Sequence, residues 1–205
     1  MANIITASRI PLLFLYLYLL YSQNSTLIFT AAFLIILFMA MDMLDGMAAR
    51  KLGQTSLVGS VLDIAVDRIY ELVLWLIFAD MNLISIFIPL IVVIRTVLTD
   101  AFRSLGVKEG TAPFKQHSLF WAKFLVASRW MRAVYGVSKV VAFSGLTLVL
   151  ALKMQNFGRS YELLLYNVHI FFRGVSWFAV FLCIIRGFPI ILNGFKLAFK
   201  IDTSE

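Results

Sequence analysis

The sequence predicts an all-α integral membrane protein, and its composition and hydropathy support this fold class. Hydrophobic residues make up 61% of the 205 residues, only 14% are charged, and the mean hydropathy is +0.92. Average globular proteins are about 45–50% apolar and about 25% charged. A soluble domain of this size could not bury so much apolar surface, so the composition indicates a membrane protein.

Apolar stretches of about 20 residues, the length that crosses a bilayer as a helix, recur six times along the chain. Short polar segments separate them, and a longer polar connection from Gly106 to about Arg132 contains a stretch suited to an interfacial helix, QHSLFWAKFLVASRWMR. No internal repeat or linker interrupts the pattern, so we expect one domain, residues 1–205. The expected spans are residues 6–22, 26–50, 59–79, 83–105, 133–153 and 163–187.

Basic residues are distributed unequally between the two sides of these spans. One side has only Lys153 and Arg159. Cytoplasmic loops of membrane proteins carry an excess of Lys and Arg, so we expect both termini at the cytoplasmic face of the cell membrane. The opposite, basic side carries Arg9, Arg50, Lys51, Arg103, Lys108, Lys115, Lys123, Arg129, Arg132, Lys139, Arg186, Lys196 and Lys200.

The net charge of +7 has the same explanation. Anionic lipid headgroups attract cytoplasmic basic residues, and a nucleic-acid partner is not expected. Cys183 stands alone in an apolar run, which excludes a disulfide framework or a thiolate metal site and indicates a small buried residue. His117 and His169 are too far apart in the sequence to form a recognisable metal pair, and we expect structural roles for both.

Acidic residues are concentrated in the segment MDMLDGMAARKLGQTSLVGSVLDIAVDRIYE, residues 41–71. Asp42 and Asp45 are three residues apart, and Asp63 and Asp67 are four apart. On a helix each pair lies on one face, about 60° and about 40° apart around the axis. Both pairs fall near the cytoplasmic ends of neighbouring expected spans, so the four carboxylates can converge.

Four carboxylates near a membrane interior need cations, because unpaired charges there are costly. The local basic residues Arg50, Lys51 and Arg68 are too few and partly misplaced. Oxygen ligands suit Mg²⁺, Mn²⁺ or Ca²⁺, and paired metal ions recur where phosphate chemistry takes place. Arg50 supplies a planar set of donors suited to a pyrophosphate. The small residues of the segment allow either close helix packing or close approach of a ligand to the backbone; they are Gly46, Ala48, Ala49, Gly53, Gly59 and Ser60.

The spacing of the whole segment resembles the signature of the CDP-alcohol phosphotransferase family, also called the CDP-alcohol phosphatidyltransferases. The matching residues are Asp42-x2-Asp45-Gly46-x2-Ala49-Arg50-x8-Gly59-x3-Asp63-x3-Asp67. The resemblance implies a six-helix membrane enzyme, often a homodimer, with a polar cavity that opens to the cytoplasm. It also implies transfer of a phosphatidyl group from CDP-diacylglycerol, or an ether analogue, to a small alcohol with release of CMP.

The resemblance also assigns roles to residues of the segment. Two divalent cations, Mg²⁺ or Mn²⁺, would be held by the four carboxylates, and Asp67 would be the general base on the acceptor hydroxyl. Glu71 lies outside the signature, so we expect it to tune the site or pair with Arg68 rather than bind metal. The metal ligands implied are Asp42, Asp45, Asp63 and Asp67, and the CDP-binding residues implied are Asp42, Gly46, Ala49, Arg50 and Gly59.

Basic residues of the later spans bear on the acceptor. A basic pocket would favour an acceptor that is itself a phosphate, such as glycerol 3-phosphate or inositol phosphate, and the acceptor-binding residues we expect are Arg95, Arg103, Arg132 and Lys139. Arg95-x7-Arg103-x2-Gly106, Gly136-x2-Lys139 and the opening Asn3-x2-Thr6-x2-Arg9 resemble the phosphatidylglycerophosphate synthase branch. Thr96 departs from that branch, where an acidic residue commonly follows the first arginine. The alternatives within the family are therefore phosphatidylinositol-phosphate synthase or an enzyme that uses another acceptor.

Two other classes of function remain open at the level of sequence. A cation channel or transporter would place acids through the depth of several spans, whereas here they cluster at one face and Arg50 goes unexplained. A family member that has lost catalysis would serve as a scaffold, although nothing in the signature indicates such a loss.

Overall fold

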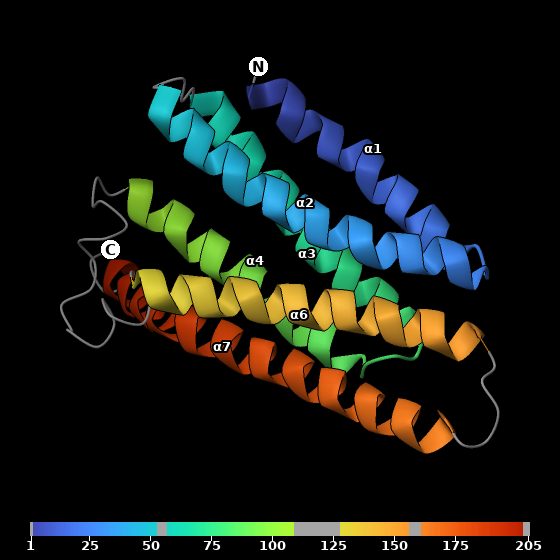
Figure 1. The fold of residues 1–205 in the computed structure, drawn as a ribbon. Helices are drawn as coiled ribbons and strands as arrows, with labels where there is room; N and C mark the ends of the chain where they lie inside the picture. The colour runs from blue at the N-terminus through green and yellow to red at the C-terminus, as the bar shows by residue number, and fades with distance from the viewer. Residues whose placement is uncertain (1, 53–56, 109–127, 156–160, 203–205) are drawn as a thin grey trace. The chain divides into compact units, whose positions relative to one another are not determined.

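The computed structural model describes residues 2–52, 57–108, 128–155 and 161–202. Within them it describes the side chains of residues 8–38, 59, 61–102, 128, 130–155 and 161–195. The described residues are all-helical, which confirms the helical fold class (Figure 1). The helices are α1 (Ala2–Tyr21), α2 (Ser25–Leu52), α3 (Leu57–Asp80), α4 (Phe87–Lys108), α6 (Arg129–Met154) and α7 (Glu162–Asp202).

Local chemistry explains two of the helix boundaries. Asn24 caps the start of α2, because its side-chain Oδ1 accepts a hydrogen bond from the amide of Thr26 at 3.0 Å. Asn82 follows the end of α3 in the left-handed backbone region, with φ of 56°. Its amide donates to the carbonyl of Ala79, and the amide of Leu83 donates to the carbonyl of Phe78, each at 3.0 Å. This is the Schellman pattern, which asparagine tolerates better than most residues.

The last helix extends beyond the expected span of residues 163–187. α7 continues to Asp202 and is 41 residues long, with Pro189 inside it. Proline removes one backbone donor, but such a loss is tolerated in membrane helices whose neighbours re-satisfy the freed groups. At about 1.5 Å per residue the helix is roughly 60 Å long, twice the ~30 Å thickness of a bilayer core.

The chain forms two compact units. The first comprises residues 1–85 and 140–175, and the second comprises residues 86–139 and 176–205. Unit 1 therefore holds α1, α2, α3, the end of α6 and the start of α7. Unit 2 holds α4, the start of α6 and the rest of α7, so α6 and α7 each contribute to both units. The expectation of a single domain stays a prediction.

Aromatic side chains fill the core of unit 1. α1 contacts both α2 and α3. The ring of Phe143, from α6, lies 4.6 Å from that of Trp75 and 5.8 Å from that of Phe78, measured between centroids. Tyr16 from α1 and Thr147 from α6 are buried, and their hydroxyl oxygens lie 2.6 Å apart. Aromatic contacts therefore join α3, which holds Trp75 and Phe78, to α6, and a buried hydrogen bond joins α1 to α6.

Unit 2 is held by close approach of α4 and α7. The rings of Phe102 and Phe195 have centroids 5.0 Å apart. Gly194 lies against Phe102, and Gly187 lies against the side chain of Arg95, so α7 presents no side chain at either contact. Cys183 is 1% exposed, which confirms it as a small buried residue.

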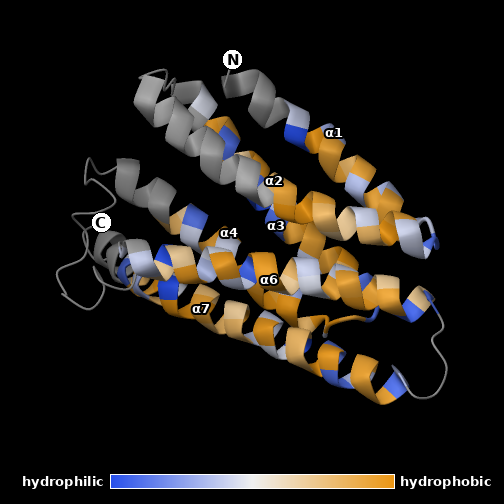
Figure 2. Ribbon diagram, in the orientation of Figure 1, coloured by the Kyte–Doolittle hydropathy of each residue, from blue (hydrophilic) through white to orange (hydrophobic). Residues whose placement is uncertain are grey.

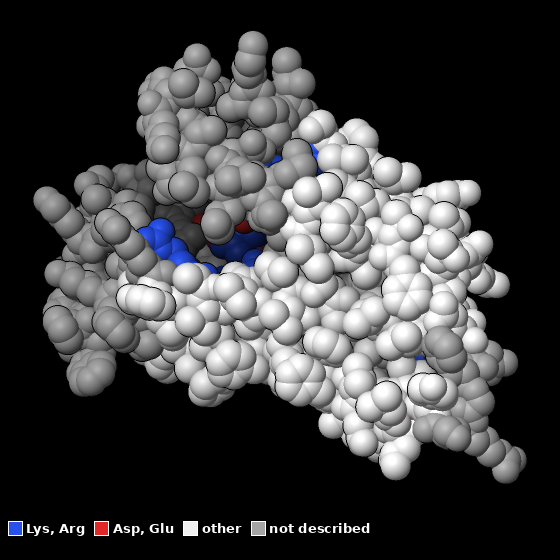
Figure 3. Space-filling model, viewed as in Figure 1, with Lys and Arg blue, Asp and Glu red and all other residues white. Residues whose placement is uncertain are grey.

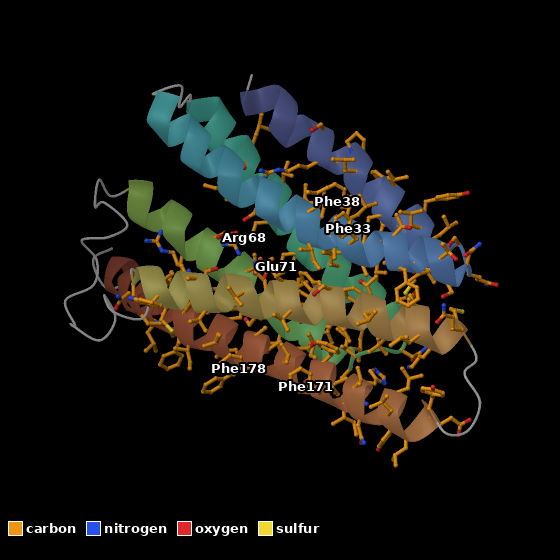
Figure 4. All side chains as sticks on the ribbon, viewed as in Figure 1. Phe33, Phe38, Arg68, Glu71, Phe171 and Phe178 are labelled. Carbon is orange, nitrogen blue, oxygen red and sulfur yellow. The ribbon has the colours of Figure 1, made fainter. Side chains whose placement is uncertain are left out.

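Large apolar side chains also cover the outside of the helices. Figure 2 shows that hydrophobic residues predominate along the described helices. Phe33 of α2 is 67% exposed, and Phe171 and Phe178 of α7 are 62% and 49% exposed (Figure 4). Water would penalise this surface, whereas lipid accepts it.

Among the residues whose side chains are described, two helical stretches are long and apolar enough to cross a membrane, Trp130–Met154 and Glu162–Phe195. Shorter apolar stretches occur at Ser8–Tyr21 and Ser25–Phe38. In α3, charged residues interrupt the apolar sequence, among them Asp63, Asp67 and Arg68. The expectation of six spans and of their orientation stays a prediction.

Candidate active site

The acidic segment extends from the end of α2 into α3. Asp42, Asp45, Gly46, Ala49 and Arg50 all lie in the last part of α2, where the backbone is helical, and their side chains are outside the described residues. In α3, Gly59 is half-buried, whereas Asp63 and Asp67 are exposed. Convergence of the four carboxylates therefore stays a prediction, and the described side chains show only the α3 pair.

Asp63 is paired with a base from another helix. The guanidinium Nη1 of Arg9, on α1, donates to Oδ1 of Asp63 at 3.2 Å. The side chain of Arg9 is 14% exposed and that of Asp63 is 54% exposed. Asp67 follows one turn later on the same face of α3.

Glu71 is buried one turn beyond Asp67, and it is 6% exposed. Its Oε2 lies 4.0 Å from Nη1 of Arg68; both residues are labelled in Figure 4. Sequence left two roles open for Glu71, and the contact shows the one in which it pairs with Arg68. The distance is long for a hydrogen bond, so the interaction is mainly electrostatic.

Among the described residues, no three His, Cys, Asp or Glu side chains are grouped as a metal ion would require. The carboxylates of α2 lie outside that set, so the metal ligands Asp42, Asp45, Asp63 and Asp67 stay a prediction. His169 has a structural contact, with its Nε2 2.7 Å from the carbonyl oxygen of Leu83. His117 lies outside the described residues.

A basic cluster lies in unit 2, and it consists of Arg95 of α4, Arg132 and Lys139 of α6, and Arg186 of α7. The guanidinium carbon of Arg186 lies 5.2 Å from the ring centroid of Tyr135, and Nζ of Lys139 lies 4.7 Å from the same centroid. Both distances fall within the range of cation–π contact. The charges of Arg95 and Arg132 act on Arg186. The expected acceptor residues are thus grouped, except Arg103, whose side chain is outside the described residues.

Two guanidinium groups of the basic cluster have a buried Nε atom without a hydrogen-bond partner among the described residues, and Arg95 is buried whereas Arg186 is half-buried. Arg95 is 8% exposed, and its Nε has no hydrogen-bond partner among the described residues; the same is true of the Nε of Arg186. Asp100 is the only acid of unit 2 whose side chain is described, and it is exposed. It stands five residues from Arg95, about 140° around the α4 axis, so the two point in different directions.

Sequence reasoning missed Arg186 and Gly187. Arg186 was counted only among the basic residues at cytoplasmic helix ends, yet it sits in the apolar run FLCIIRGF, which was the available signal. Gly187 makes room for Arg95, because a Cβ built there would lie 2.5 Å from Nε of Arg95 and 2.8 Å from its Cγ. A side chain at position 187 would therefore displace Arg95.

Few charged side chains of the described residues are visible on the face drawn in Figure 3. Figure 3 shows a face that is mostly uncharged outside the small areas of Lys, Arg, Asp and Glu. The clustered bases of unit 2, among apolar surroundings, fit a protein that binds phosphate-bearing ligands.

Comparison with known proteins gives the family. Searches among curated proteins and among solved structures returned no significant match. The profile of the CDP-alcohol phosphatidyltransferases matches residues 1–185, which is most of the chain. Members of that family are membrane-integral enzymes that transfer a phosphatidyl group from a CDP-alcohol to an alcohol acceptor, and they generally use divalent metal ions. The chain therefore belongs to the CDP-alcohol phosphatidyltransferase family and is a phosphotransferase.

Proposed function

We propose that the chain is a phosphatidylglycerophosphate synthase, which transfers the phosphatidyl group of CDP-diacylglycerol to glycerol 3-phosphate and releases CMP. The observation that carries the choice of acceptor is the basic cluster, in particular the buried Nε atoms of Arg95 and Arg186, which lack a hydrogen-bond partner among the described residues. The resemblance of the arginine and glycine spacing to that branch supports the same choice. Family membership favours this enzyme over the cation channel considered as a rival.

The energetics of the basic cluster favour a ligand with a phosphate group. A buried donor without a partner costs about 1–3 kcal/mol, and more when it is charged. Like charges that act on one another add to this cost. A phosphate dianion would accept hydrogen bonds from both arginines and would offset their charge. An uncharged acceptor such as inositol offers no such compensation.

The α3 carboxylates fit a site for divalent ions. Asp63 and Asp67 present exposed oxygen ligands on one helix face, and oxygen is what Mg²⁺ and Mn²⁺ prefer. We infer that two ions would be held by these residues together with Asp42 and Asp45. When bound, such ions neutralise the pyrophosphate and make CMP a better leaving group. Gly46, Ala49, Arg50 and Gly59, together with Asp42, would bind the CDP part.

The transfer itself exchanges one phosphorus–oxygen bond for another. The acceptor's hydroxyl oxygen bonds to the phosphorus of the phosphatidyl group, and the bond from that phosphorus to the CMP oxygen breaks, with its electron pair leaving on CMP. Asp67 takes the proton of the hydroxyl as general base. The basic cluster holds the acceptor's own phosphate, so that binding energy is used to orient the hydroxyl.

The remaining features of the proposal concern the setting of the enzyme. We propose six membrane spans, a polar cavity that opens to the cytoplasm, and both termini at the cytoplasmic face. The excess of basic residues on that side supports this orientation. A homodimer is proposed from the resemblance alone.

The test of the acceptor is a panel of alcohols supplied to the purified protein. The full chain is incubated with CDP-diacylglycerol, Mn²⁺ or Mg²⁺, and one of glycerol 3-phosphate, inositol phosphate, inositol or serine. We expect CMP release and a phosphatidylglycerophosphate mass with glycerol 3-phosphate. Turnover with inositol phosphate instead would identify the alternative branch, and no CMP release with any acceptor would contradict catalysis by this chain.

A further inference from the structure

Asp63 differs from an ordinary metal-binding carboxylate because a base from another helix already holds it. Arg9 and Asp63 are 54 residues apart in the chain, and Nη1 of Arg9 donates to Oδ1 of Asp63 at 3.2 Å. Arg9 lies in α1, in the largely apolar run ASRIPLLFL, and its side chain is only 14% exposed. A guanidinium so far removed from water needs an anion nearby, and Asp63 supplies one.

A second residue of α3 lies near Arg9. Tyr70, seven residues beyond Asp63 and so on the same face of α3, is within electrostatic reach of Arg9. The hydroxyl of Tyr70 is buried and has no hydrogen-bond partner among the described residues. It carries no charge, so of these two α3 neighbours Asp63 is the one that offsets the charge of Arg9.

We propose that Arg9 is a resident counter-cation that neutralises Asp63 before divalent ions bind and that limits how tightly they bind afterwards. This inference rests on the proposed metal site. Without ions, Arg9 relieves the mutual repulsion of the carboxylates and orients Asp63. With ions bound, its positive charge repels them, and only Oδ2 of Asp63 is left unshared. Arg9 is thus a positioning residue that acts through Asp63.

Removing this charge should raise the affinity for divalent ions, whereas the loss of a merely structural residue would not raise it. Arg9→Gln keeps a hydrogen-bond donor for Asp63 but removes the positive charge, so divalent ions should bind more tightly. Because Asp63 is half exposed, solvent screens the repulsion, and the expected gain in affinity is roughly tenfold. Arg9→Lys retains the charge and should bind ions within about threefold of the wild type.

The measurement is Mn²⁺ binding by the full chain in detergent, with free Mn²⁺ followed by electron paramagnetic resonance. Protein stripped of ions with a chelator is titrated without substrate, for the wild type, Arg9→Gln and Arg9→Lys. Arg173→Gln is the matched control, because Arg173 is exposed on α7, and its Mn²⁺ affinity should equal that of the wild type. Added salt should reduce the difference in Mn²⁺ affinity between Arg9→Gln and the wild type.

A double-mutant cycle tests the ion pair separately. Melting temperatures of the wild type, Arg9→Gln, Asp63→Asn and the double variant are compared in chelator and in saturating Mn²⁺. In chelator we expect the effects of the two substitutions on the melting temperature to be non-additive, which is the sign of an energetic coupling between Arg9 and Asp63. In saturating Mn²⁺ this coupling should be clearly smaller.

The outcomes separate the failure of this inference from the failure of the proposed function. Wild-type protein that binds Mn²⁺ while Arg9→Gln binds it equally or less tightly would overturn the counter-cation alone. Wild-type protein that binds no Mn²⁺ would overturn the metal site and the counter-cation with it. Coupling that is absent in chelator would show that Arg9 and Asp63 are not energetically paired.

Discussion

The two units treat charge in opposite ways. In unit 1 acids and bases are paired within the protein, Arg9 with Asp63 and Arg68 with Glu71. In unit 2 the basic cluster of Arg95, Arg132, Lys139 and Arg186 includes two Nε atoms, those of Arg95 and Arg186, without a hydrogen-bond partner among the described residues. The first arrangement is compatible with an empty site, because the protein supplies its own counter-charges. In the second, an anion would complete the hydrogen bonding of these two Nε atoms, which is the basis of the proposed phosphorylated acceptor.

The largest expected effect tests whether the catalytic chemistry belongs to unit 1. Asp67→Asn removes the proposed base, and general-base catalysis contributes on the order of a thousandfold. We expect CMP release to fall by about that factor while the melting temperature stays near that of the wild type. Asp80→Asn, at the other end of α3, is the matched control and should retain activity. Comparable loss in both variants would remove the special role of Asp67.

The next effect tests the assignment of unit 2 to acceptor binding. Arg95→Ala and Arg186→Ala each remove charge-assisted hydrogen bonds to the acceptor phosphate, worth about 1.5–3 kcal/mol. The KM for glycerol 3-phosphate should therefore rise roughly ten- to a hundredfold, with the KM for CDP-diacylglycerol changed far less. Arg173→Gln serves as the exposed control on α7. Unchanged acceptor kinetics would return both arginines to structural roles.

A smaller effect sharpens the comparison by moving Arg95 without removing it. Gly187→Ala places a methyl group where Arg95 now lies, so the guanidinium must shift. We expect the KM for the acceptor to rise roughly three- to tenfold, less than on truncation of Arg95. Gly174→Ala is the control on the same helix, because a Cβ there would meet nothing within 4 Å. Equal kinetics in the two variants would contradict the role given to Gly187.

The smallest effect concerns the stability of unit 1 rather than its chemistry. The Thr147 hydroxyl donates to the carbonyl of Phe143 at 2.7 Å, so the Tyr16 hydroxyl is the donor in its contact with Thr147. Tyr16→Phe loses that bond, worth about 1 kcal/mol, and should lower the melting temperature by about 3 °C. CMP release below that temperature should be unchanged. A much larger loss would mean that Tyr16 supports more than this hydrogen bond.

Hydropathy located the helices well because apolar length determines where a membrane helix can run. The expected span 59–79 corresponds to α3 at Leu57–Asp80, and the span 133–153 to α6 at Arg129–Met154. α7 extends beyond the expected span of residues 163–187 because Pro189 does not end the helix. The expected span reflected the thickness of a bilayer, and a helix can continue past the bilayer. The order and number of the described helices were thus within reach of the sequence.

The site was predictable only where chemistry is local in the chain. The spacing of Asp63 and Asp67 places them on one face without knowledge of the fold, and the same spacing identified the family. Arg9 and Arg186 acquire their roles from partners on other helices, Asp63 on α3 and Tyr135 on α6. Their charge alone had suggested anchoring at the cytoplasmic face. Tertiary packing, which one sequence does not reveal, distinguishes an anchor from a site residue.

The passage of α6 and α7 through both units makes the chain sensitive to changes of register. One residue inserted near Lys139 in α6, or near Ser176 in α7, would rotate everything beyond it by about 100° relative to everything before it. On α7, His169 and Arg186 could not then both keep their present neighbours. Changes of chain length in a lineage of such enzymes should therefore accumulate in the connections between helices, while these two helices keep a fixed count of residues.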